Sequence, residues 1–253
     1  MLKAKDGDWY KNIWTLDIKN ESWVEDTENQ VDFIVKTLNL TGTERILDLA
    51  CGFGRHSLSF AKRGYSVVGV DITKNYIDDA KTTARKLSLA VEFICADIRD
   101  IHFINEFDVV LSLADGAIGY LENDEENLKI FDKIADALKI NGKHIMDIIN
   151  AEHAELCFPS RGWEIGEKAL ALSLLEWDNE TRKIIYAGWN VPYGRLVEKP
   201  VFSEGYSYRL YSKAELQDIL GQRRMRIIDT FSNYCGKKDS SQELQLIVYS
   251  QKE

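Results

Sequence analysis

Short apolar runs alternate with amphipathic helical patterns through the first 150 residues, and this alternation limits the folds open to the chain. RILDLA (45–50) is a nearly continuous apolar run, typical of a strand buried on both faces. Four more runs follow: YSVVGV (65–70), VEFICA (91–96), FDVVLSLA (107–114) and KHIMDII (143–149). Strands that alternate with helices form right-handed βαβ units and a parallel sheet covered on both faces. The sequence therefore predicts a doubly wound α/β domain.

The predicted helices carry their apolar residues on one face. Three such faces are formed by Val31, Ile34, Val35 and Leu38, by Ile77, Ala80, Ala84 and Leu87, and by Leu128, Phe131, Ile134 and Leu138. Asn123, with Glu126 three residues later, has the spacing of a capping box and opens the third helix. These helices fill the intervals between the predicted strands.

From about residue 163 the apolar pattern changes from a period of 3.6 to a period of 2. Three alternating segments separated by turn sequences predict an antiparallel three-stranded meander: ALALSLLEW (169–177), KIIYAGWNV (183–191) and FSEGYSYRLY (202–211). Ser212 and Glu215 then open a helix, and MRIIDTF (225–231) and ELQLIVYS (243–250) are the last strands of the sheet. We therefore expect three parts, which are an aromatic N-terminal segment (1–24), a cofactor-binding domain (25–160 and 212–253) and an inserted meander (161–211).

Charge and cysteine content narrow the classes of function. The chain has 32 basic and 41 acidic residues, a net charge of −9, which disfavours nucleic acid and anionic membranes as partners. No apolar run approaches the roughly 20 residues of a membrane span, and the N-terminus has no signal-peptide pattern. The four cysteines and four histidines lack metal-ligand spacing. We therefore expect a cytoplasmic protein with neither disulfides nor a metal site.

The segment LDLACGFGRHS (47–57) is the most informative about function, because it has the pattern of a strand, a glycine turn and a helix. Glycines at 52 and 54 permit positive φ and the close approach of a ligand, towards which the helix directs its N–H groups. Asp71 ends the next strand, where an acidic side chain can bind ribose hydroxyls. Asp97 follows the third strand, and Asp48 precedes the turn. We predict that these three carboxylates converge on one crevice at the strand ends.

A nicotinamide dinucleotide is one candidate ligand for this crevice. The dinucleotide fingerprint requires a third glycine where Ser57 stands, and Asp48 would repel a pyrophosphate. An NAD-linked oxidoreductase is therefore the weaker alternative.

Four motifs in register resemble those of class I S-adenosylmethionine-dependent methyltransferases: LDLACGFG (47–54), GVDIT (69–73), CADIRDI (95–101) and FDVVLSL (107–113). The resemblance implies S-adenosyl-L-methionine as cofactor and a seven-stranded Rossmann-like sheet whose final strand is antiparallel. One position departs from the pattern, because the family usually has glycine where Ala50 stands, and we expect alanine to be tolerated. The chain looks like the branch with a β-meander inserted after strand five, which includes aminodeoxysugar N-methyltransferases and uncharacterised small-molecule methyltransferases.

The resemblance also implies roles for single residues. It assigns the turn from Gly52 to Gly54 to the methionine moiety, Asp48 to its amino end, Asp71 to both ribose hydroxyls and Asp97 to the adenine amine. The other implied cofactor contacts are Ala50, Ile72, Ile98 beside the adenine ring, Ser112 and Leu113 near the methionine amine, and Tyr10 near the methionine carboxylate. The segment DWYKNIW (8–14) would then be a lid over the cofactor, or else a helix packed permanently on the domain.

Candidates for the acceptor side follow the fourth strand and the meander. Tyr120 faces the acceptor or packs at a helix entrance, and Asp115 binds or deprotonates the acceptor or is an ordinary turn aspartate. His56, on the first turn of the cofactor helix, has a packing role as its simpler explanation. Arg209 and Tyr211 share one face of the last meander strand and bind the acceptor if that face covers the crevice. Asn150 and His153, just past strand five, receive no role.

These features predict methyl transfer from S-adenosyl-L-methionine to a nitrogen or oxygen atom of a small-molecule acceptor by in-line displacement, a reaction that depends on proximity and orientation and needs no metal. The NPPY-type signature for exocyclic amines of bases is absent, since the chain has SLADGAIGYL (112–121) there. A non-catalytic cofactor-binding regulator is a third hypothesis. The sequence leaves open the acceptor and the choice between monomer and homodimer.

Overall fold

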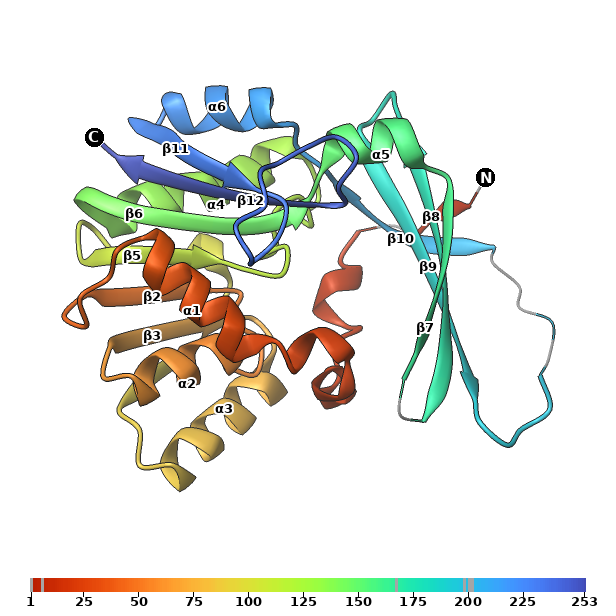
Figure 1. The fold of residues 1–253 in the computed structure, drawn as a ribbon, viewed down its shortest axis with the longest axis horizontal. Coiled ribbons are helices and arrows are strands. Elements are labelled where there is room, and N and C mark those ends of the chain that lie inside the picture. Colours follow the sequence, from red (N-terminus) through yellow and green to blue (C-terminus); the bar gives the residue numbers. More distant parts are fainter. Residues whose placement is uncertain (1, 6, 167, 198, 200–202) are drawn as a thin grey trace.

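The computed structural model of the protein describes residues 2–5, 7–166, 168–197, 199 and 203–253. Phe202, the first residue of the third predicted meander strand, lies outside the described residues, as do residues 1, 6, 167, 198, 200 and 201 of the predicted segments. Figure 1 shows two sheets side by side, one within an α/β body and one beside it. No helix among the described residues is long and apolar enough to cross a membrane.

The larger sheet has seven strands in the order β11-β12-β6-β5-β2-β3-β4. Strands β2 to β6 are parallel, and β12 runs antiparallel to both β6 and β11. This confirms the predicted sheet with an inverted final strand. The strands are β2 (Arg45–Leu49), β3 (Ser66–Asp71), β4 (Val91–Cys95), β5 (Phe107–Ser112), β6 (Leu138–Ile149), β11 (Met225–Phe231) and β12 (Gln245–Lys252).

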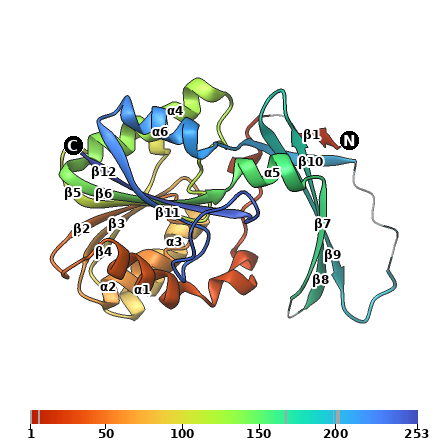
Figure 2. The same ribbon diagram turned by 45° about the horizontal axis from the view of Figure 1, so that its top comes forward.

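Helices cover both faces of this sheet (Figure 2). On one face α1 and α2 bury Val31, Ile34 and Phe60 against the sheet, and on the other face α4 and α6 bury Phe131 and Leu216. The Asn123 side chain accepts the Glu126 N–H, and Ser212 forms a complete capping box with Glu215. The helices are α1 (Thr27–Thr37), α2 (Arg55–Lys62), α3 (Lys74–Lys86), α4 (Asp124–Ala137), α5 (Ala151–Cys157) and α6 (Lys213–Gly221).

The smaller sheet has five strands in the order β1-β10-β9-β8-β7, two more than the predicted meander. Its strands are β1 (Lys3–Ala4), β7 (Ser160–Ile165), β8 (Ala169–Asp178), β9 (Lys183–Pro192) and β10 (Glu204–Arg209). Strand β7 has only two large apolar side chains, Trp163 and Ile165, and both are exposed, so its sequence marks no buried face. Strand β1 has two residues and pairs in parallel with β10, from the far end of the chain, so no local pattern marks it.

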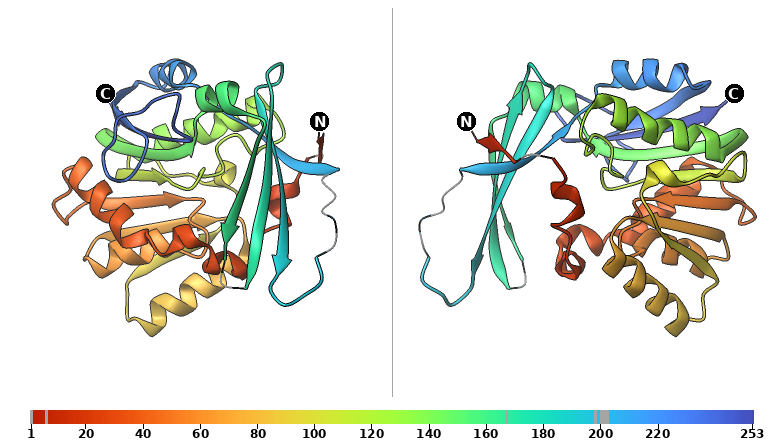
Figure 3. Two further views of the ribbon diagram at one scale, coloured as in Figure 1. Left: turned by 45° about the vertical axis from the view of Figure 1, so that its right-hand side comes forward. Right: turned by 180° about the vertical axis from the view of Figure 1, so that it is seen from behind.

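The N-terminal segment connects the two sheets (Figure 3). After β1 it forms three 3₁₀ turns, Trp9–Lys11, Leu16–Asn20 and Ser22–Val24, before α1 begins. Trp9 and Tyr10 are buried, and the Trp9 indole N–H donates to the backbone oxygen of Ser207 in β10. The segment is therefore packed against the smaller sheet, while its middle part lines the cavity described next.

Candidate active site

A cavity of about 460 Å³ lies at the carboxyl ends of the parallel strands and is covered by the N-terminal segment. This is the edge at which open α/β sheets bind ligands. Five aspartates and one arginine line it: Asp48, Asp71, Asp97, Asp115, Asp147 and Arg55. The aspartates come from β2, β3 and β6 and from the residues that follow β4 and β5, so the predicted convergence of Asp48, Asp71 and Asp97 is found.

The turn between β2 and α2 depends on residues with positive φ. Ala50, Gly52 and Gly54 have φ values of 53°, 57° and 80°. Ala50 thus occupies a conformation that favours glycine, which accounts for the glycine usual at this position of the motif. A Cβ atom on Gly54 would lie 2.7 Å from the Phe93 ring, whereas one on Gly52 would meet nothing closer than Tyr76 at 3.9 Å. Gly54 therefore allows α2 to pack, and Gly52 faces the cavity.

Asp71 and Asp48 hold this turn in place. Asp71 Oδ2 accepts the Gly52 N–H at 2.8 Å, and its Oδ1 accepts the Thr73 N–H at 2.7 Å. Asp48 is 2% exposed and accepts the hydroxyl of Ser57 at 2.6 Å. Burial raises the pKa of Asp48 to about 6, although the Ser57 hydrogen bond opposes the shift, and burial also raises the pKa of Asp71.

Asp97 belongs to a charged cluster at another end of the cavity. Arg99 pairs with Asp97 at 2.7 Å, with Glu122 at 3.0 Å and with Glu126 at 2.8 Å. The Tyr10 hydroxyl donates to Glu122 at 3.2 Å. Tyr10, which the resemblance assigns to the methionine carboxylate, lines the cavity with its hydroxyl beside Glu122 in this cluster.

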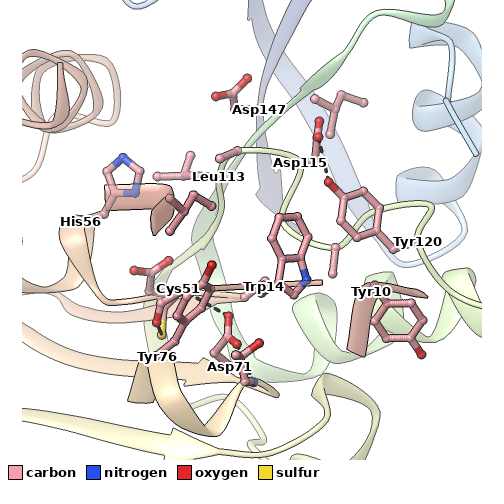
Figure 4. Close-up of a pocket in the computed structure, with 18 of the residues that line it drawn as sticks. Tyr10, Trp14, Cys51, His56, Asp71, Tyr76, Leu113, Asp115, Tyr120 and Asp147 are labelled. Carbon is pink, nitrogen blue, oxygen red and sulfur yellow. Dashed lines mark hydrogen bonds between the residues drawn. The ribbon is translucent and has the colours of Figure 1, made fainter. Parts of the chain in front are cut away.

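Asp115 and Tyr120 face the cavity from the loop after β5 (Figure 4). The Tyr120 hydroxyl donates to Asp115 Oδ2 at 3.0 Å, and the Tyr208 hydroxyl also donates to this carboxylate. Burial, with the charge of Asp147, raises the pKa of Asp115 to about 6. Trp14 lies parallel to the Tyr120 ring, at 6.4 Å between centroids and 11° between planes. The Asp115 carboxyl group, with a pKa of about 6, therefore lies beside the Tyr120 ring, which is stacked on Trp14.

The backbone of this loop is strained. Residues 114–117 all have positive φ, between 51° and 69°, and only one of them is glycine. The Asp115 N–H donates to the backbone oxygen of Asp147 at 2.8 Å, which ties the loop to β6. Such strained conformations persist only where surrounding contacts hold them in place, and they are frequent at functional sites.

Most of the residues predicted for the site come together on this cavity. Nine of the eleven predicted cofactor residues line it, as do Asp115 and Tyr120. The other two lie behind the lining: Gly54 caps α2, and Ser112 is buried with its hydroxyl 3.4 Å from His144 Nε2.

Arg209 and Tyr211, predicted to contact the acceptor, lie elsewhere. Arg209 is buried and pairs with Glu215 and Asp124, and Tyr211 packs edge-on against Phe131 of α4. Strand β10 ends at Arg209, where the chain turns into the core of the larger sheet. Tyr211 lies beyond the end of β10, so the two residues do not share a strand face. Tyr208, on the face of β10 opposite to Arg209, meets Asp115 and Tyr120 instead.

Several lining residues were not predicted from sequence. Asp147 sits inside the β6 run in the way that Asp48 sits inside β2, so the same signal could have found it. Trp14 belongs to the segment 8–14 that was expected to form a lid, whereas Tyr76 and Arg55 carry no such signal. His56 lines the cavity, with its Nε2 atom 2.8 Å from Gln30 Oε1, and burial lowers its pKa. Asn150 caps α5, and neither Asn150 nor His153 lines the cavity.

Comparison with known proteins identifies a methyltransferase domain in the chain. A family model described as a methyltransferase domain matches residues 46–142. The putative methyltransferase GWCH70_2453 of Geobacillus sp. (strain WCH70) is 28% identical over 135 residues, which are 53% of this chain and 54% of that protein. The chain therefore aligns with about half the length of this curated relative.

Solved structures resemble the chain over most of its length. An S-adenosylmethionine-dependent methyltransferase from Clostridium acetobutylicum ATCC 824 has a TM-score of 0.75 at 19% identity and covers 93% of this chain and 96% of its own. CalS10, an amino pentose methyltransferase from Micromonospora echinaspora, has a TM-score of 0.64 at 15% identity, with 96% and 99% covered. At these identities the likeness shows the fold. Together with the domain match over residues 46–142, it shows a methyltransferase domain in a chain that has the fold of class I S-adenosylmethionine-dependent methyltransferases.

Proposed function

We propose that the protein transfers a methyl group from S-adenosyl-L-methionine to a nitrogen or oxygen atom of a small-molecule acceptor. The observation that carries this proposal is that one cavity contains both the glycine turn with its acidic strand ends and the Asp115–Tyr120 pair. The cavity measures about 460 Å³, a size suited to small molecules.

The residues at the strand ends fit the cofactor. Asp71 is fixed by two backbone N–H groups, and each carboxylate oxygen keeps a lone pair for a ribose hydroxyl. Asp97 and Ile98 would hold the adenine end, while Gly52 leaves room for the methionine moiety. When bound, the cofactor supplies an electrophilic methyl carbon on a sulfonium centre.

Asp115 is the group placed to handle the acceptor proton. An ammonium nitrogen has no lone pair and must lose a proton before it attacks the methyl carbon, and a hydroxyl must lose its proton to give the methyl ether. In either case Asp115 would take up the proton. A carboxylate with a pKa of about 6 accepts a proton near neutral pH more readily than an ordinary aspartate does. The Tyr120 and Tyr208 hydroxyls would hold the Asp115 carboxylate in one orientation.

The aromatic side chains around Asp115 would position the acceptor and exclude water. Trp9, Trp14, Tyr120 and Tyr208 form successive ring contacts, with centroids 4.8 to 6.4 Å apart. In-line displacement gains most from such positioning and from a dry site.

The test is transfer of a radiolabelled methyl group to a panel of small amines and alcohols. The panel starts with amino sugars, because CalS10 is an amino pentose methyltransferase. We expect label in at least one acceptor, and we expect Asp115→Asn to lower its rate about 100-fold while cofactor binding persists. Asp78→Asn, on the exposed side of α3, is the matched control. A folded protein that binds the cofactor and labels no acceptor would contradict the proposal and favour a regulatory role.

A further inference from the structure

Acidic side chains outnumber basic ones in the lining of the cavity. Five aspartates face it, whereas Arg55 supplies the only arginine or lysine side chain among its described lining residues. Arg99, the other guanidinium close to the cavity, is surrounded by Asp97, Glu122 and Glu126. An anionic group in this cavity therefore has a single cation to bind.

Arg55 is held in place by neutral partners. It is the first residue of α2, directly after the glycine turn, and it is half-buried. Its Nη1 atom donates to Thr27 Oγ1 at 2.8 Å and to Gln30 Oε1 at 2.6 Å, both in α1. The guanidinium also lies over the Trp23 ring, 4.9 Å from the centroid. Asp48, Asp147 and Asp26 act on its charge from a distance, but none of the hydrogen bonds given for its side chain goes to a carboxylate. The other donors of its five-donor fork therefore remain for a ligand.

The cofactor presents one anionic group to this set of charges. Its sulfonium, ammonium and adenine amine suit carboxylates, but its methionine carboxylate would be repelled by the aspartates. Arg55 and Gly52 belong to the same turn, so a methionine moiety against Gly52 brings its carboxylate to the Arg55 side of the cavity. The N-terminal end of α2 favours an anion in the same place.

We infer that Arg55 binds the carboxylate of the methionine moiety, with Thr27 and Gln30 orienting its guanidinium. The inference rests on the proposed cofactor. It places this group away from Tyr10, whose hydroxyl is bound to Glu122 in the cluster around Asp97. A guanidinium forms two parallel hydrogen bonds with a carboxylate, which fixes the methionine end and therefore the direction of the methyl group.

The test compares two ligands that differ only in this carboxylate, S-adenosylmethionine and decarboxylated S-adenosylmethionine, by titration calorimetry. We expect Arg55→Met to weaken binding of S-adenosylmethionine by about 10- to 100-fold. The same variant should leave binding of the decarboxylated ligand within about threefold or strengthen it, because a positive charge has been removed from near a cationic ligand. Arg55→Lys should retain part of the preference for the carboxylate.

Arg63→Met is the matched control, because Arg63 caps the other end of α2 and pairs with Glu28 and Asp32 of α1. It should leave both affinities unchanged. Equal losses for the two ligands in Arg55→Met, or an unaltered ratio, would overturn the inference while the proposed function stands. Wild-type protein that binds neither ligand would overturn the cofactor assignment, and the inference with it.

Discussion

Asp48 illustrates how burial of one carboxyl group connects stability to pH. Its pKa is raised to about 6 by burial, against an unfolded value near 4. The folded state therefore binds this proton more tightly than the unfolded state, and the contribution to stability is full at low pH and lost as pH rises through 6.

Removal of this titration should flatten the dependence of stability on pH. For the ligand-free protein, we expect the stability of Asp48→Asn relative to wild type to rise by about 2 kcal/mol between pH 4.5 and pH 7.5. Denaturant unfolding at both pH values measures the difference. An unchanged difference would show that Asp48 is charged throughout and that its environment is more polar than the geometry indicates.

The hydrogen bond between Tyr120 and Asp115 should affect how turnover depends on pH. The proposed proton acceptor must be deprotonated, so kcat/KM should rise through about pH 6. The hydroxyl of Tyr120 stabilises the Asp115 carboxylate, so Tyr120→Phe should raise the Asp115 pKa and move the rise to higher pH, with kcat about tenfold lower. Tyr193→Phe, far from the cavity and bonded to the Gly166 oxygen, is the control. If kcat/KM rises with the same midpoint pH in Tyr120→Phe and in Tyr193→Phe, the proposed role of Asp115 is contradicted.

Some site residues could be predicted from sequence for a clear reason. Asp71 ends β3 and Asp97 follows β4, and parallel strands bring their carboxyl ends to one edge, so the position along the chain determines the position in space. Arg55 and Trp14 have no such relation. Their place depends on which way a long side chain points and on how an irregular N-terminal segment packs, which are decided by tertiary contacts.

The order of elements could be read from the alternation of periods, but pairing at the edges could not. Strands β2 to β6, β11 and β12 follow the predicted runs. In the central strands β2, β3 and β5 the reason is that buried strands need continuous apolar sequence. The face of β10 that meets the cavity could not be read from the sequence, because the alternating pattern continues to Tyr211 whereas the strand ends at Arg209. A one-residue change of register exchanges the faces of a strand.

The contact between the loop after β5 and β10 depends on Gly119. Its φ is 85°, and a Cβ atom would lie 1.9 Å from the Arg209 backbone oxygen, while its own oxygen accepts the Arg209 N–H. Gly64 has a φ of 91° with nothing within 4 Å of a Cβ atom, so Gly64→Ala isolates the cost of the conformation. We expect Gly119→Ala to lower the free energy of unfolding by about 1 to 3 kcal/mol more than Gly64→Ala. Equal losses in denaturant unfolding would show that this contact can relax.

At the scale of the molecule, the cavity is built from parts that lie far apart in the sequence. The larger sheet provides the acidic strand ends, the loop after β5 provides Asp115 and Tyr120, and the N-terminal segment covers them. The smaller sheet reaches the site through Tyr208 and through Ser207, which binds Trp9. Under the proposed function, the cofactor contacts would lie on the larger sheet and the acceptor contacts on the loop and the smaller sheet.

The most direct test of the cofactor site is calorimetric titration with S-adenosylhomocysteine, the product form of the cofactor, beside NAD. We expect S-adenosylhomocysteine to bind and NAD not to bind. We expect Asp71→Ala to weaken binding at least about tenfold, because hydrogen bonds to a charged group are lost, and Asp71→Asn, which keeps one acceptor oxygen, to weaken it less. Binding of NAD without S-adenosylhomocysteine, or unchanged affinity for S-adenosylhomocysteine in a folded Asp71→Ala protein, would contradict the assignment of this cofactor.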